Sequence, residues 1–120
     1  VATHAGMDAL LGAAGLGDLG ERFPDDDVSF RGADSLELLA DVMRRVAAAG
    51  WRVINVDLTV VCERPKLAPH RAAMAARLAV TLGVPVAAVG VKATTTEGMG
   101  FAGRGEGIVA LAVCLLTDER

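Results

Sequence analysis

The chain has 120 residues, of which 52% are hydrophobic but only 3% aromatic, and its net charge is −3. This length suits one domain over residues 1–120, and the interspersed charges argue against nucleic-acid binding. The mean hydropathy of +0.43 is high for a small soluble monomer, so we expect apolar surface to be buried between subunits. No apolar run approaches the roughly 18 residues of a membrane span, so no membrane association is expected.

Two helices are predicted in the first half of the chain. Residues 1–16 are rich in alanine and leucine at helical spacing, and three glycines between residues 15 and 20 should end this helix. Asp34 or Ser35 can cap a second helix, and Gly50 is well placed to end it.

A strand with one buried face is predicted for residues 51–63, because apolar and polar residues alternate there. Cys62 in this run and Cys114 in a later one are expected to be buried, reduced thiols and not a disulfide framework. The expected inward-facing residues are Ile54, Val56, Leu58, Val60 and Cys62.

The second half continues with a helix from about Pro69 to Leu82, since proline is tolerated in a first turn. A connector over residues 84–89 has room for one helical turn, and residues 89–93 form a short strand. The continuous apolar run 108–116 predicts a central strand buried on both faces, although a helix fits the pattern as well. This order predicts an α+β fold, a two-layer α/β sandwich whose mixed sheet carries helices on one face.

The segment 91–107 is the strongest candidate for a binding loop. It holds three threonines, Glu97, several glycines and Arg104 between two apolar runs. Hydroxyls and glycine N–H groups suit the oxygens of a phosphate-bearing ligand, and a carboxylate suits Mg²⁺. Arg104 and Glu106 should point the same way in an extended segment, either as an ion pair or as a receptor for a second anion.

Other polar residues have both a binding and a structural interpretation. His4 and Asp8 share one helix face, where the imidazole could ligate a metal or simply face solvent. Asp18 and the run Asp25–Asp27 could bind ligand hydroxyls or form a solvated turn. Lys66, at the end of a strand, is either a ligand-binding residue or a surface lysine.

These motifs, in this order, closely resemble those of the 2-C-methyl-D-erythritol 2,4-cyclodiphosphate synthase family. The resemblance covers essentially all 120 positions, and motifs of this length are very specific. The matching segments are 4–5, 8–14, 16–20, 23–25, 32–35, 55–57, 64–70, 92–97 and 100–107.

The resemblance implies an enzyme of non-mevalonate isoprenoid biosynthesis, a phosphorus–oxygen lyase. The family cyclises 4-diphosphocytidyl-2-C-methyl-D-erythritol 2-phosphate and releases CMP. By this likeness His4 is one of three ligands of Zn²⁺ or a similar divalent metal, Glu97 helps to hold Mg²⁺ or Mn²⁺, and Thr95 polarises phosphate in the transition state.

The resemblance also implies a set of substrate-binding residues. The erythritol part is held by Asp18, by the backbone of Leu19 and Gly20, and by Phe23, Pro24, Asp25, Asp26 and Asp27. The cytidine and its phosphates contact Cys62, Glu63, Arg64, Pro65, Lys66, Leu67, Ala68, Ala93, Thr94 and Thr95. Thr96 and Glu97 are further substrate-binding residues. Phe101 and Arg104 complete the set.

Family members are homotrimers with active sites between subunits. The resemblance therefore implies a trimer, with Arg104 and Glu106 beside an apolar cavity on the three-fold axis that can hold an isoprenoid diphosphate. It also implies a cytoplasmic protein, or a plastid one in a plant-type source. Some relatives carry a fused cytidylyltransferase domain.

Relatives carry about forty residues upstream that this chain lacks, including two zinc ligands, a His-Ser-Asp segment and a strand. Catalytic zinc sites normally take three protein ligands, so we expect little activity from these 120 residues alone. The alternative hypothesis is a non-catalytic trimeric module that binds nucleotide. Intact Lys66, Thr94, Thr95 and Glu97 favour the enzyme.

Overall fold

The computed structural model describes residues 2–22, 35–63 and 66–119. Three strands form one sheet in the order β2-β1-β3, and β1 pairs in parallel with β2 but antiparallel with β3. The predicted mixed sheet is therefore confirmed. The strands are β1 (Arg52–Val61), β2 (Val89–Thr94) and β3 (Val109–Thr117).

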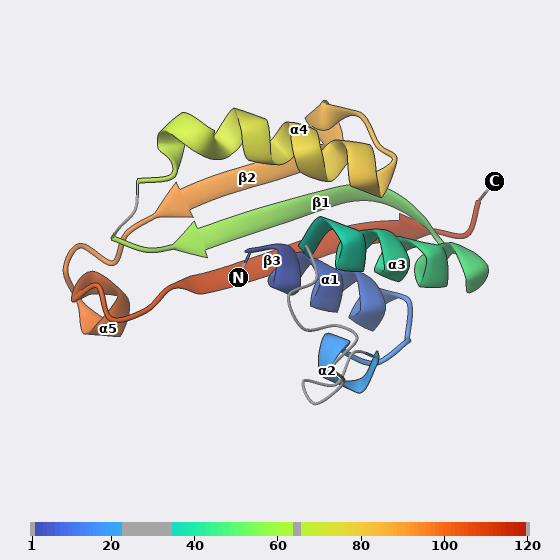
Figure 1. Ribbon diagram of the computed structural model, residues 1–120, viewed down its shortest axis with the longest axis horizontal. Coiled ribbons are helices and arrows are strands. Elements are labelled where there is room, and N and C mark those ends of the chain that lie inside the picture. Colours follow the sequence, from blue (N-terminus) through green and yellow to red (C-terminus); the bar gives the residue numbers. More distant parts are fainter. Residues whose placement is uncertain (1, 23–34, 64–65, 120) are drawn as a thin grey trace.

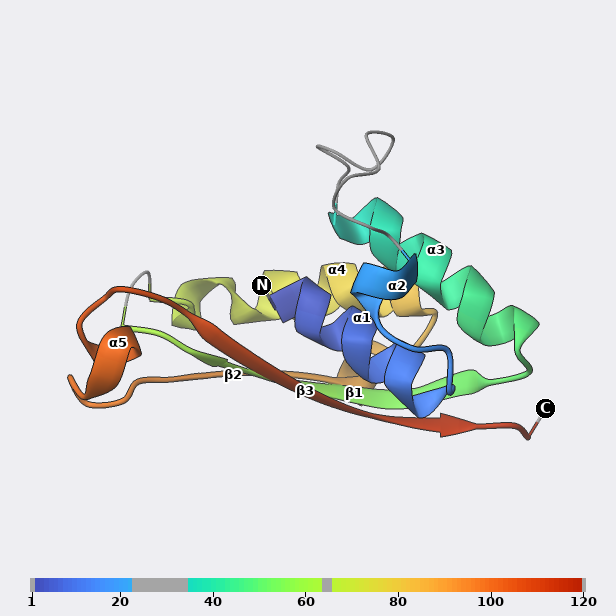
Figure 2. The same ribbon diagram turned by 90° about the horizontal axis from the view of Figure 1, so that it is seen from below.

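Three helices lie on one face of this sheet, and the opposite face is left uncovered by the described part of the chain (Figures 1 and 2). They are α1 (Ala2–Ala13), α3 (Ser35–Ala48) and α4 (Arg71–Leu82). This arrangement confirms the two-layer α+β sandwich with helices on one side. No helix among the described residues is long and apolar enough to cross a bilayer.

The described residues also include four short helical segments: α2 (Leu19–Arg22), η2 (Ala68–His70), η3 (Val86–Ala88) and α5 (Gly100–Gly103). The helical turn predicted in the connector is η3. Gly20 falls inside α2, so only the glycines before it separate α1 from the next element. Figure 1 shows α5 beyond one end of the sheet, away from the helical layer.

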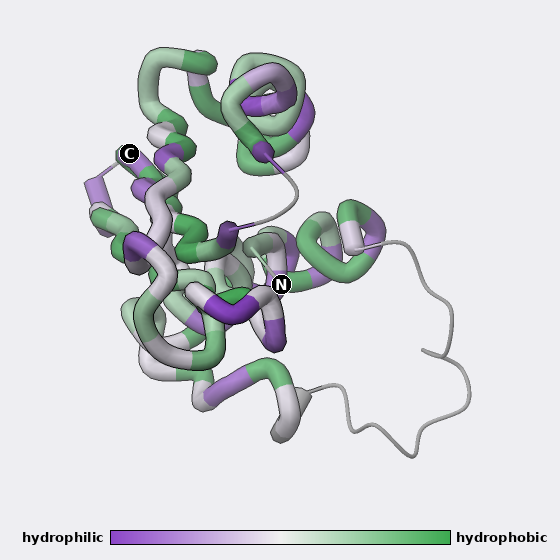
Figure 3. Tube along the Cα trace, turned by 90° about the vertical axis from the view of Figure 1, so that its left-hand side faces the viewer, coloured by the Kyte–Doolittle hydropathy of each residue, from purple (hydrophilic) through white to green (hydrophobic). Residues whose placement is uncertain are grey.

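The core lies between the helices and the sheet. Leu10 and Leu11 of α1 and Val42 and Val46 of α3 are fully buried, together with Leu58 of β1. Hydrophobic and hydrophilic residues alternate around the helical coils in Figure 3, as expected for helices with one buried face. Burial of one such aliphatic side chain contributes about 1.5–3 kcal/mol, so this layer contact positions the sheet firmly.

The connection from β1 through α4 to β2 explains where the strands end. Parallel strands require a crossover, and α4 supplies it before Gly83 ends the helix with φ of 71°. The register pairs Val56 with Val89 and Val61 with Thr94. The carboxyl ends of β1 and β2 therefore lie side by side at one edge of the sheet.

The predicted inward face of β1 is correct from Val56 onward but wrong at Ile54. The pairing with β3 shifts register between Val53 and Asn55, which marks a β-bulge. A bulge adds one residue to one strand and reverses the alternation before it. Val53 is therefore the buried residue, whereas Ile54 is only half-buried.

The prediction of a central strand buried on both faces is wrong for β3. Within the described residues β3 pairs only with β1, and one of its faces is exposed. Leu111, Val113 and Leu115 are 60%, 71% and 55% exposed on that face. Ala112 and Cys114 pack against the core on the other. The continuous apolar run thus serves the core on one side and forms an apolar column on the other.

Both cysteines are free thiols, as predicted, but only Cys62 is buried as expected, whereas Cys114 is half-buried. Cys114 donates to the carbonyl oxygen of Ala9 at 3.4 Å, and burial raises the pKa of its thiol. A raised pKa lowers the thiolate fraction at neutral pH.

We expect Cys114 to react with iodoacetamide more slowly at pH 8 than it does in the urea-unfolded chain, because the thiolate is the nucleophile. Raising the pH should narrow this difference. Peptide mass spectrometry after timed quenching measures the rate for each cysteine. Equal rates for Cys114 in the folded and unfolded chains would contradict the effect of burial.

Candidate functional site

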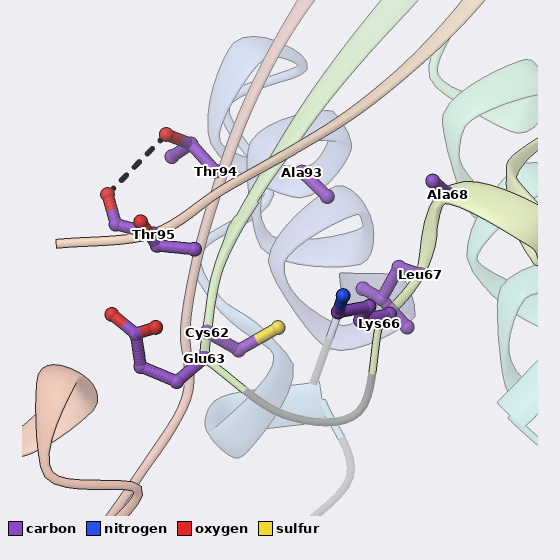
Figure 4. A pocket seen from close by; sticks show the side chains of 8 residues that line it. All are labelled: Cys62, Glu63, Lys66, Leu67, Ala68, Ala93, Thr94 and Thr95. Carbon is purple, nitrogen blue, oxygen red and sulfur yellow. Dashed lines mark hydrogen bonds between the residues drawn. The ribbon is translucent and has the colours of Figure 1, made fainter. Parts of the chain in front are cut away.

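A cavity of about 300 Å³ opens at the carboxyl ends of β1 and β2. Ligands of open α/β sheets bind beyond the carboxyl ends of the strands, and this cavity has that position. Figure 4 shows Thr94 and Thr95 on one side, Lys66 and Leu67 on the other, and Cys62 between them. The lining residues are Cys62, Glu63, Lys66, Leu67, Ala68, Ala93, Thr94 and Thr95.

All eight lining residues belong to the set that the family resemblance assigns to the cytidine and its phosphates. Arg64 and Pro65, from the same set, lie outside the described residues. Thr96 and Glu97 follow Thr95 in the loop after β2 but are not among the described residues that line this cavity. Segments from two strands and the loop leading to α4 are thus brought together.

The parallel ladder explains how these segments meet. It continues one residue past the end of β1, where the Cys62 N–H donates to the carbonyl oxygen of Thr94, the last residue of β2, at 3.0 Å. Cys62 continues the inward face of β1 and is buried at the base of the cavity. Lys66 and Thr95 are exposed at its rim, where a charged ligand can reach them.

The threonine loop ends in a tight turn. The Met99 N–H donates to the Thr96 carbonyl oxygen at 3.1 Å, and the two central residues, Glu97 and Gly98, have φ of 55° and 81°. Positive φ at both central positions is the signature of a type I′ turn, which favours glycine, asparagine and aspartate. Glu97 is the only non-glycine residue with positive φ in the described chain. Its backbone is strained, and such strain costs of order 1–3 kcal/mol.

The hydroxyls of the loop hold this turn in place. Thr95 Oγ1 accepts a hydrogen bond from the Glu97 N–H at 3.1 Å, and the Thr96 hydroxyl donates to the Met99 carbonyl oxygen. The Thr94 hydroxyl donates to the Thr95 carbonyl oxygen at 3.3 Å. The three threonines therefore have an internal structural role besides any contact with a ligand.

The glycines of this loop allow close backbone packing. The sequence had instead suggested that they bring N–H groups to a phosphate. A Cβ on Gly103 would lie only 2.2 Å from the carbonyl carbon of Gly98, so α5 rests directly on the turn. The Gly98 N–H is bound to the Glu63 carboxylate at 3.1 Å, and the Gly103 N–H to the Met99 carbonyl oxygen. These two amides are thus engaged within the protein and not directed at a phosphate. No sequence pattern predicts the contact between Glu63 and Gly98.

Arg104 and Glu106 form the predicted ion pair, with Arg104 Nε 2.8 and 2.9 Å from the two carboxylate oxygens. An extended segment was expected here, but the chain turns instead. Arg104 ends α5, and Gly105, with φ of 74°, turns the chain so that the two side chains meet. Phe101 is 49% exposed beside them. Neither Phe101 nor Arg104 lines the cavity below Thr94 and Thr95.

His4 and Asp8 share a face of α1, as predicted, and His4 Nε2 lies 3.3 Å from Asp8 Oδ2. The other Asp8 oxygen accepts the Leu19 N–H at 2.7 Å, which ties α1 to α2. This carboxylate orients the imidazole in the way that second-shell groups orient a metal-binding histidine. Among the residues described, no group of three or more histidine, cysteine or acidic side chains could hold a metal. His4 therefore fits the role of one ligand in a larger set.

Of the residues predicted to hold the erythritol part, the three that the structure describes, Asp18, Leu19 and Gly20, lie beside α1 and do not line the cavity. Asp18 and Gly20 are exposed at the start of α2, whereas the Leu19 side chain is buried in the core. Leu19 can therefore contact a ligand only through its backbone, as the resemblance implies. The remaining residues of that set, Phe23 to Asp27, lie outside the described residues.

The positive φ of Glu97 predicts a difference in stability between two variants at this position. Glu97→Gly should be more stable to urea than Glu97→Ala by about 1 kcal/mol, because both lose the carboxylate but only alanine retains the strain of a positive φ. Equilibrium unfolding followed by circular dichroism measures the difference. Equal stability of the two variants would show that the turn relaxes at no cost.

Comparisons with known proteins agree with this geometry. The model of the YgbB family matches residues 1–117. A 2-C-methyl-D-erythritol 2,4-cyclodiphosphate synthase of Alkalilimnicola ehrlichii is 57% identical over 119 residues, which are 99% of this chain and 73% of that protein. A bifunctional enzyme IspD/IspF of an Anaeromyxobacter species is 58% identical over all of this chain, which covers 31% of that longer protein.

Two solved structures share the fold. The bifunctional IspDF from Campylobacter jejuni gives a TM-score of 0.91 at 45% identity, over 95% of this chain and 31% of that one. A 2-C-methyl-D-erythritol 2,4-cyclodiphosphate synthase in its CDP-bound form gives 0.88 at 39% identity, over 98% and 75%. With a family match over nearly every residue, the chain belongs to the YgbB family, the 2-C-methyl-D-erythritol 2,4-cyclodiphosphate synthases of the non-mevalonate pathway.

Proposed function

We propose that the protein converts 4-diphosphocytidyl-2-C-methyl-D-erythritol 2-phosphate into 2-C-methyl-D-erythritol 2,4-cyclodiphosphate and CMP. The observation that carries this proposal is the cavity at the ends of β1 and β2. Its lining joins the residues that the family resemblance assigns to the cytidine diphosphate, in a chain similar to a synthase whose structure has CDP bound.

The lining suits a nucleoside diphosphate. Leu67, Ala68 and Ala93 offer apolar surface to a base, while Lys66 offers a cation to the diphosphate. Thr95 completes the phosphate side with its hydroxyl. Phosphoryl transfer needs charge neutralisation and in-line positioning more than covalent catalysis, and such groups supply both.

The reaction is an intramolecular displacement at phosphorus. An oxygen of the 2-phosphate forms a bond to the β-phosphorus, and the bond from that phosphorus to the oxygen bridging to the α-phosphorus breaks. CMP leaves with the bonding electron pair. Lys66 would stabilise the charge that develops on the leaving phosphate, and Thr95 would polarise the phosphoryl oxygen.

Two protein groups would hold divalent cations. His4, oriented by Asp8, would contribute one ligand to a zinc-type site, and the Glu97 carboxylate would contribute to a Mg²⁺ or Mn²⁺ site. Such cations neutralise phosphate charge and orient the reacting groups. The alternative of a non-catalytic nucleotide-binding module is not favoured, because the similar curated proteins are named as the synthase.

We also propose that the protein works as a homotrimer whose active sites lie between subunits. The apolar column Leu111, Val113 and Leu115 supports this assembly, because an exposed apolar column on a strand favours association. The ion pair of Arg104 and Glu106 beside Phe101 would then lie near the axis. The ligand proposed for the axis is an isoprenoid diphosphate. The compartment proposed for the protein is the cytoplasm, or a plastid in a plant-type source.

Lys66→Ala and Thr95→Ala should each lower kcat/KM for CMP release by about 10²-fold, the typical loss for one group that stabilises developing charge. Chelation of divalent cations should abolish the reaction. The assay uses the full-length protein carrying this sequence, with Arg44→Ala, an exposed residue on α3, as the control. Unchanged rates in both cavity variants would refute the roles given to these residues.

Val113→Lys should convert the trimer to monomers while the fold persists, because it places a charge in the centre of the apolar column. Val80→Lys is the matched control, since Val80 is 83% exposed on α4 in the other layer. Sedimentation velocity measures the mass, and circular dichroism checks the fold. A trimer that survives Val113→Lys would show that this column is not the interface.

A further inference from the structure

Glu63 lines the cavity, yet its carboxylate is engaged away from the space that a ligand would fill. Its Oε1 accepts the Gly98 N–H at 3.1 Å, which links the end of β1 to the turn 35 residues later. Figure 4 places the carboxylate on the Thr95 side of the cavity, opposite Lys66. The link therefore runs between the cavity wall and the turn that carries Glu97.

Charge argues against a direct contact between Glu63 and a nucleotide phosphate. An ionised carboxylate only accepts hydrogen bonds, and so do phosphate oxygens. The two would repel each other unless a cation or a donor stood between them. The Glu63 carboxylate instead accepts a hydrogen bond within the protein, from the Gly98 N–H.

The turn needs support because it holds Glu97 in a strained conformation, with φ of 55°. Gly103 presses on Gly98 from the side of α5, and Thr95 Oγ1 accepts the Glu97 N–H. Glu63 reaches the turn from outside the loop, because its carboxylate accepts the Gly98 N–H from the end of β1. It thus fixes the turn relative to β1, and so relative to the cavity.

We propose that Glu63 is a positioning residue, which holds the Glu97–Gly98 turn against the cavity so that the Glu97 carboxylate reaches the cation on the ligand's phosphates. This inference rests on the proposed function, since it assumes a nucleoside diphosphate bound with a divalent cation. Glu63 thus acts through the turn, whereas Lys66 acts on the ligand itself. The role assigned to Glu63 by the resemblance is changed from a substrate contact to a support for one.

The test compares Glu63→Ala with Glu63→Gln, whose amide oxygen can still accept the Gly98 N–H. Glu37→Ala, a carboxylate in the first turn of α3, is the control. Two quantities are measured: hydrogen exchange of the Gly98 amide by NMR, and the affinity for CDP by calorimetry with and without Mg²⁺. The ratio of the CDP affinity with Mg²⁺ to the CDP affinity without Mg²⁺ reports how much the cation contributes to binding.

In Glu63→Ala we expect Gly98 exchange to accelerate and the Mg²⁺ enhancement of CDP affinity to fall, each about tenfold, as for loss of one charge-assisted hydrogen bond. Affinity without Mg²⁺ should stay within about twofold, because the cavity wall remains, and this separates positioning from a general loss of structure. Glu63→Gln should restore most of both effects. The control should match the wild type.

Unchanged Gly98 exchange in Glu63→Ala would overturn the inference, and so would faster exchange with an intact Mg²⁺ enhancement. An equal loss of CDP affinity with and without Mg²⁺ would identify Glu63 as a direct contact instead. A wild-type protein that binds no CDP would refute the proposed function, and the inference with it. The wild-type titration therefore distinguishes the two failures.

Discussion

The parallel pairing of β1 with β2 is the constraint on which the site depends. It places the carboxyl ends of both strands at one edge, so that Cys62 and Glu63 meet Ala93 and Thr94. The crossover helix α4 begins beside the same edge, and the loop before it supplies Lys66. The core beneath α1, α3 and α4 holds these strands rigidly, and rigid elements position binding groups more precisely than loops do. The cavity is thus a consequence of sheet topology, and its chemistry comes from the residues at the strand ends.

The loop after β2 adds a second constraint, because a strained turn must be held where the ligand needs it. Glycines allow α5 to rest on the turn, the threonine hydroxyls brace it from within, and Glu63 ties it to β1. Strained backbone persists only where its surroundings hold it, and it clusters at functional sites. The conformation of Glu97 is therefore consistent with a carboxylate that is positioned for binding at some cost in stability.

Most of the fold could be predicted from local patterns. The helices ending near Ala49 and Leu82 and the strand around Leu58 follow from periodicity and glycine placement. The bulge near Ile54 and the one-sided exposure of Val113 could not, because both depend on which strands pair, and that is a long-range property. The cavity residues were found through motifs, whereas the Glu63–Gly98 contact joins positions 35 residues apart and leaves no local signature.

A nucleoside diphosphate is expected to bind at the joined ends of β1 and β2. The most direct measurement is an NMR titration of the ¹⁵N-labelled protein with CDP and Mg²⁺. The largest chemical-shift changes should fall on Cys62, Ala93 and Thr95 and should saturate together. Changes confined to the separate cavity that Thr3, Ser35 and Arg77 line would contradict it, and so would the absence of any saturable change.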